Sequence, residues 1–65
     1  MKTRDGYEVE VGMVLNDSTG MYEVMSIRDN VELKEIHFDE DGNEDGYEDG
    51  YRLLTPYEVG KMTYR

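Results

Sequence analysis

Apolar and polar residues alternate along the first half of the chain in the pattern of short β-strands. Residues 7–11 have a period of two, which indicates a half-buried strand. Gly12 suggests a bend, after which residues 13–15 continue extended, and the polar residues 16–20 have the composition of a turn. Residues 21–27 form the next predicted strand, with Tyr22 and Val24 on one face.

The phase of this pattern breaks within the following strand. After a short connection at residues 28–30, Val31 and Leu33 share one phase, whereas Ile36 and Phe38 share the other. A β-bulge near residues 34 and 35 would return both pairs to the same face. Small curved sheets use such bulges to close on themselves, so the pattern favours a bent sheet.

The C-terminal part of the sequence predicts a strand followed by a short helix. Residues 51–54 have the pattern of a returning strand. Thr55 suits the N-cap, Pro56 the first helical position and Glu58 the third, which completes a capping box. Gly60 weakens the helix soon afterwards, and Val59 and Met62 are expected to face the sheet.

These elements predict one mainly β domain over residues 1–65, with a flexible acidic loop at 39–50. The expected fold is a small SH3-like or strongly bent antiparallel barrel of four or five strands with one short C-terminal helix. The predicted core consists of Val9, Val11, Val14, Tyr22, Val24, Ile27, Val31, Leu33, Ile36, Phe38, Leu53, Val59 and Met62.

Composition narrows the classes of partner and cofactor. The chain has 65 residues, no Cys and one His, so disulfides, thiolate metal sites and a His-based zinc site are excluded, and we expect no cofactor. A chain this short buries only about 60% of its unfolded surface, so a homodimer stays an open alternative. The net charge of −9 disfavours nucleic acid and anionic membranes as direct partners. With no long apolar run and no signal peptide, the sequence predicts a cytoplasmic protein.

The most unusual stretch is an acidic tract, residues 39–49, in which Glu-Asp-Gly recurs with a period of four across residues 40–50. It holds seven of the sixteen carboxylates, and no Lys or Arg lies between Lys34 and Arg52. Residues 41–46 match the first half of an EF-hand loop, but Arg52 occupies the position that needs a bidentate Glu. Because strands are expected to flank the tract, we predict no specific metal site.

A second interpretation is a surface that imitates DNA. Carboxylates two apart on a strand are about 6.6 Å apart, a spacing comparable to that of phosphates along one DNA strand. Glu8 and Glu10 have this separation on the first predicted strand. The alternative is a solvated loop that only provides solubility. The predicted partner-binding residues are Glu8, Glu10, Glu23, Asp39, Glu40, Asp41, Glu44, Asp45, Tyr47, Glu48 and Asp49.

Six tyrosines and the absence of a catalytic set also favour binding over catalysis. Tyrosine offers large contact area with few rotamers to freeze. Tyr22 is a predicted core residue and Tyr51 is a second candidate for the core, and we expect at least two of Tyr7, Tyr47, Tyr57 and Tyr64 to be exposed. The only His, His37, has no convincing Ser or Asp partners, and no phosphate-binding or dinucleotide motif occurs. The sequence therefore predicts a protein that is not an enzyme.

In size, charge and composition, together with the tract at residues 39–49, the chain resembles the small acidic proteins with which bacteriophages block host DNA-binding proteins. The resemblance implies a DNA mimic that acts in the host bacterial cytoplasm on a basic host protein. Its candidate targets are the nucleoid-associated protein HU first, then a CRISPR or restriction effector, a DNA-repair glycosylase or RNA polymerase. The alternative is a small structural or adaptor domain of SH3-like fold that binds a protein partner, with the acidic loop passive.

Overall fold

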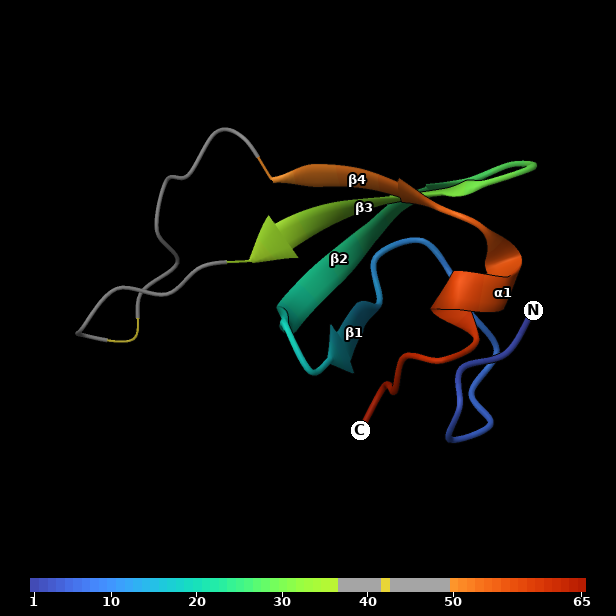
Figure 1. The fold of residues 1–65 in the computed structure, drawn as a ribbon, viewed down its shortest axis with the longest axis horizontal. Coiled ribbons are helices and arrows are strands. Elements are labelled where there is room, and N and C mark those ends of the chain that lie inside the picture. Colours follow the sequence, from blue (N-terminus) through green and yellow to red (C-terminus); the bar gives the residue numbers. More distant parts are fainter. Residues whose placement is uncertain (37–41, 43–49) are drawn as a thin grey trace.

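Four antiparallel strands form one sheet, in the spatial order β1-β2-β3-β4, and a one-turn helix follows them (Figure 1). The strands are β1 (Val14–Asp17), β2 (Gly20–Ile27), β3 (Val31–Ile36) and β4 (Tyr51–Leu54), and the helix is α1 (Pro56–Val59). The computed structural model describes residues 1–36, 42 and 50–65. The prediction of a mainly β fold with a short C-terminal helix is confirmed.

The turn between β1 and β2 is shorter than the sequence predicted, because Asn16 and Asp17 belong to β1. Only Ser18 and Thr19 separate the strands. The Asp17 carboxylate accepts hydrogen bonds from the Thr19 backbone N–H at 2.7 Å and the Thr19 hydroxyl at 2.6 Å. An acidic side chain that binds the backbone two residues ahead is the usual way in which Asp stabilises a tight turn.

The predicted bulge exists, but it lies in β2 and not near residues 34 and 35. Val24 pairs with Leu33 and Ser26 pairs with Glu32, so Met25 is the extra residue. β3 is continuous through the phase break, and Ile36 therefore lies opposite Met21 on the outer face of the sheet. The predicted position was wrong because a phase break in one strand can equally place the later residues on the other face. Phe38 lies outside the described residues.

The predicted strand at residues 7–11 is also wrong. A single bridge joins Lys2 to Glu8, and the Val9 N–H donates to the Met1 carbonyl at 3.0 Å. A turn then follows in which Gly12 has a φ of 95°, a value that glycine adopts without strain. The turn leaves Val9 buried but Val11 63% exposed. Alternation alone could not reveal that a turn separates these residues from the sheet.

The core lies between the inner face of the sheet and the segments that cover it. Seven predicted core residues are buried: Val9, Tyr22, Val24, Val31, Leu33, Val59 and Met62. The prediction missed Leu15, which is fully buried on β1, and it was wrong about Leu53, which is 65% exposed. Successive strand residues face opposite sides, so half-buried Leu54 takes the inner face and Leu53 the outer one.

The C-terminal segment is the best-predicted part of the chain. Thr55 caps α1: its hydroxyl accepts from the Glu58 N–H at 3.2 Å, and the Glu58 carboxylate accepts from the Thr55 N–H at 3.1 Å. Beyond the helix, Thr63 pairs with Asn16 on the outer edge of β1. Closure of the predicted barrel would need β1 to pair with β4, and within the described residues the sheet is open with these two strands as its edges.

Candidate functional site

The acidic tract connects two strands that are neighbours in the sheet. β3 ends at Ile36, and β4 begins at Tyr51 beside it, with Lys34 opposite Tyr51. One step beyond this pair, the Glu35 N–H donates to the Gly50 carbonyl. The tract residues themselves, 39–41 and 43–49, lie outside the described residues, as does His37. The sheet therefore holds the two sides of this connection, at Ile36 and Gly50, next to each other.

Most of the net charge, −7 of −9, belongs to this connection. The tract holds seven carboxylates and no Lys or Arg. The remaining chain has nine carboxylates against seven basic residues, which gives a net charge of −2 out of the total of −9. The electrostatic field of the protein therefore has its main source between β3 and β4.

The described members of the predicted acidic array lie on separate parts of the fold. Glu8 is exposed and pairs with the N-terminal ammonium group at 3.3 Å. Glu10 is exposed at the turn before β1, and Glu23 lies on the outer face of β2, opposite Lys34 on β3. Because no strand spans Glu8 and Glu10, the regular spacing predicted for them has no basis in the fold.

The exposed tyrosines confirm one prediction. Tyr7, Tyr51 and Tyr57 are exposed, with Tyr57 at 75%. The Lys61 ammonium lies 4.5 Å from the centroid of the Tyr57 ring, which is a cation–π arrangement. Tyr22 is buried as predicted, and its hydroxyl is within hydrogen-bond distance of the Thr19 hydroxyl at 2.6 Å.

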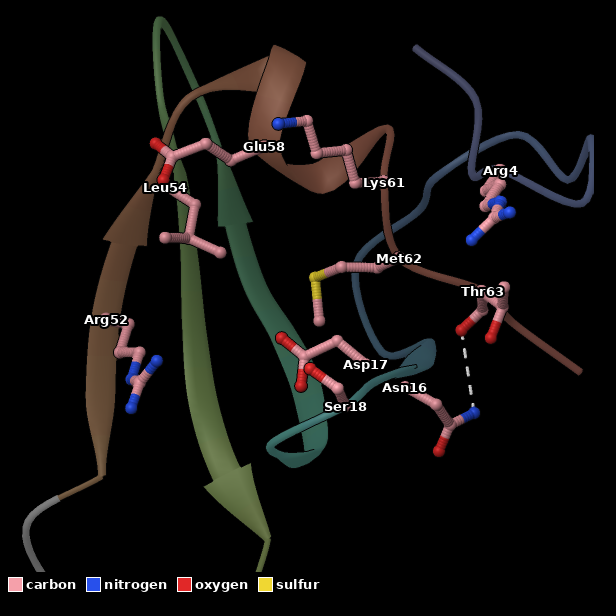
Figure 2. A pocket seen from close by; sticks show the side chains of 10 residues that line it. All are labelled: Arg4, Asn16, Asp17, Ser18, Arg52, Leu54, Glu58, Lys61, Met62 and Thr63. Atoms are coloured by element: carbon pink, nitrogen blue, oxygen red, sulfur yellow. Dashed lines mark hydrogen bonds between the residues drawn. The ribbon is translucent and has the colours of Figure 1, made fainter.

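A groove of about 570 Å³ that the sequence did not predict lies between β4, the β1–β2 turn, α1 and the C-terminal segment (Figure 2). Three of the seven basic residues line it: Arg4, Arg52 and Lys61. Met62 points into its centre, and Leu54 lies on its β4 side. These residues are far apart in the sequence, so no local pattern could have indicated that they meet.

Most charges in this groove are already engaged. Arg52 forms an ion pair with Glu35 at 3.1 Å and lies 5.3 Å from the Tyr22 ring centroid. The hydroxyl of Thr19 lowers the pKa of Asp17, and the backbone N–H of Thr55 lowers that of Glu58, so both carboxylates stay ionised as local caps. Most charged side chains of the groove therefore already have local partners, and the groove is not a preorganised binding site for an anion.

A carboxylate clamp joins the two ends of the chain. Asp5 accepts from the Thr3 hydroxyl at 2.6 Å and from the backbone N–H groups of Tyr64 and Arg65 at 3.0 and 2.9 Å. The Thr3 hydrogen bond first, and then the two backbone donors, lower the pKa of Asp5 to about 2. The clamp holds the segment that covers the β1 edge.

In the described part of the chain, no three Asp, Glu, His or Cys side chains gather closely enough to hold a metal ion. None of the described helices is long and apolar enough to cross a lipid bilayer. No protein-family model, curated protein or solved structure matches this chain.

Proposed function

We propose that this chain is a non-enzymatic acidic binding protein that occupies the basic DNA-binding surface of another protein and thereby excludes DNA. The observation that carries the proposal is the concentration of charge: seven carboxylates, without a single basic residue, connect two neighbouring strands. A basic surface that binds duplex phosphates is attracted to such a density of negative charge.

The fold supports this role because it holds together the residues on either side of the connection that contains the tract. The ends of the connection meet through the Glu35–Gly50 hydrogen bond and the ion pair between Glu35 and Arg52. A charged segment anchored at both ends loses less conformational freedom on binding than a free tail of equal charge. The partner-binding residues of this proposal are those of the tract, with Tyr47 among them. Glu8, Glu10 and Glu23 contribute only to the overall negative electrostatic potential of the protein.

The first target to test is the nucleoid-associated protein HU, and the site of action is the bacterial cytoplasm. A CRISPR or restriction effector, a DNA-repair glycosylase and RNA polymerase are further targets of the same chemistry, because each has a basic surface for DNA. Binding should fall steeply with salt, by roughly 100-fold between about 50 and about 500 mM, because the attraction is screened.

The test compares two variants with the same change in net charge, measured by displacement of labelled DNA from HU. The tract variant is D41N/E44Q/D45N/E48Q/D49N. The control variant is E8Q/E10Q/E23Q/D29N/E32Q, with every change outside the tract.

We expect the tract variant to lose roughly 100-fold in affinity and the control variant less than about tenfold, because the tract carries the local field. Equal losses would show that net charge alone acts. Unchanged binding by the tract variant would reject the tract as the binding surface.

A small adaptor domain with a passive acidic loop is the alternative function, and the exposed side chains of Tyr57 and Leu53 favour it. A hydrophobic interface changes little with salt. Binding that persists at high salt and is lost in Y57A would therefore support the adaptor function over DNA mimicry.

A further inference from the structure

The two edges of the sheet differ in whether another segment covers them. At the β1 edge, the Asn16 N–H donates to the Thr63 carbonyl at 2.6 Å and the Thr63 N–H donates back at 2.9 Å. At the β4 edge, no described residue makes such a pair with Tyr51 or Leu53. An edge strand with unpaired backbone groups is a template for another strand.

The register shows which groups of β4 point outward. In an antiparallel pair, directly opposed residues alternate between those that exchange hydrogen bonds and those that do not. The Glu35 N–H donates to the carbonyl of Gly50, the residue before β4, so the hydrogen-bonded positions on β4 are Arg52 and Leu54. Tyr51 and Leu53 therefore direct their N–H and C=O groups away from β3.

The side chains along this edge are accessible as well. Tyr51 is 56% exposed and Leu53 is 65% exposed, and both lie on the outer face of the sheet. Leu53 is opposite Glu32, which is exposed on the same face of β3. A basic side chain on an added strand would reach the Tyr51 ring for a cation–π contact and approach the Glu32 carboxylate.

The edge ends where the backbone is again satisfied. The Thr55 N–H donates to the Glu58 carboxylate, and the Thr55 carbonyl accepts from the Val59 N–H at 3.0 Å. Four outward groups, two on Tyr51 and two on Leu53, thus define the length of the edge, and they begin two residues after the acidic tract.

We propose that the β4 edge pairs with an extended basic segment of the partner protein, which adds to the sheet as a fifth strand. Charge complementarity selects this occupant: the seven carboxylates of the tract, which precedes β4 in the sequence, attract a basic segment, whereas a second copy brings another net charge of −9. Addition to a sheet edge is a common mode of peptide recognition, in which backbone hydrogen bonds supply affinity. The inference rests on the proposed function, because it requires that the tract attract the basic segment electrostatically before the segment pairs with β4.

The test uses the intact chain and two synthetic peptides of equal charge. The first is the capped heptapeptide Lys-Val-Lys-Val-Lys-Val-Lys, which can pair as a strand. The second is the same peptide with every backbone amide N-methylated, so that it keeps its charge but donates no backbone hydrogen bond. Affinities come from calorimetry, and amide hydrogen exchange of each β4 residue is followed by NMR.

We expect the unmodified peptide to bind roughly tenfold tighter than the methylated one, and to slow exchange at Tyr51 and Leu53 by at least about tenfold. Arg52 and Leu54 serve as internal controls, because their N–H groups already face β3 and their exchange changes little.

The remaining outcomes separate the two proposals. Equal binding of both peptides, without slower exchange at Tyr51 and Leu53, would overturn the strand addition while leaving charge-driven binding intact. Failure of both peptides to bind would reject the electrostatic function and the inference with it. Slower exchange at these two amides as the protein alone is concentrated would overturn the inference by assigning the edge to a second copy.

Discussion

The two edge strands of the sheet, β1 and β4, have equal length but differ in the pairing of their outward backbone groups. β1 is flanked by the C-terminal segment, and the Asn16–Thr63 pair satisfies the outward backbone groups of Asn16. β4 has exposed Tyr51 and Leu53 side chains, and its outer groups have no described partner. Figure 1 shows β4 along the edge of the sheet opposite to β1.

This difference illustrates two ways in which an open sheet can protect its edge strands. Natural proteins protect sheet edges by covering them or by placing charge beside them. Here, the segment held by the Asp5 clamp pairs with Asn16 on the β1 edge, whereas β4 begins two residues after a tract of seven carboxylates. Because charge repels a second copy of this acidic chain but attracts a basic segment, we propose that the β4 edge serves for binding.

The largest expected effect is the difference in stability lost when alanine replaces the buried leucine of one edge strand or the exposed leucine of the other. Leu15 on β1 is fully buried, so Leu15→Ala should lower the free energy of unfolding by about 2–5 kcal/mol. Leu53 on β4 is mostly exposed, so Leu53→Ala should change it by less than about 0.5 kcal/mol. Urea denaturation measures both. A comparable loss in both variants would mean that something covers the β4 edge.

A smaller effect is expected at the start of β4. A Cβ atom at Gly50 would lie 2.6 Å from the Glu35 Cβ, closer than the two atoms tolerate. Gly50→Ala should therefore destabilise by about 1–3 kcal/mol, as overpacking does.

Gly60→Ala is the matched control for this substitution. Gly60 has a φ of −64°, and its nearest neighbour would be 3.4 Å from the new Cβ. Alanine there should raise the free energy of unfolding by about 0.4–1 kcal/mol. If thermal denaturation ranks the two variants equally, the close approach of β4 to Glu35 is not a constraint.

The smallest expected effect concerns the clamp over the β1 edge. The folded-state pKa of Asp5 is about 2, below its ordinary value of 3.8. The stabilisation by Asp5 is therefore complete only well above pH 3.8, and it declines as the pH falls through this value toward 2.

Asp5→Asn should remove this part of the acid sensitivity and speed amide exchange at Asn16 and Thr63, with little effect at Arg52. Exchange measured by NMR at neutral pH checks the local effect. Unchanged exchange at Asn16 would show that the pairing with Thr63 does not depend on the clamp.

Local patterns predicted the elements whose residues act on their neighbours. Glu58 reaches Thr55 within one turn, so the capping box was visible in the sequence, and β2 and β4 followed from their apolar residues. Val11 and Leu53 were wrongly placed in the core, because alternation identifies two faces but not which face is covered. The same distinction applies to the candidate site. The charged tract can be identified from the sequence alone, whereas the position of β4 as an edge strand depends on the strand order of the sheet.

The sequence by itself determined the mainly β class, the capped helix and the concentration of charge between residues 39 and 49, because these follow from short-range geometry and from counting charges. Only the tertiary structure decided that no strand holds Glu8 and Glu10, and that Arg4, Arg52 and Lys61 meet in one groove. It also decided that Thr63 pairs with Asn16 on β1, while no described residue pairs with the outer side of β4. These outcomes depend on contacts between residues far apart in the chain, and such contacts arise only when the whole core assembles.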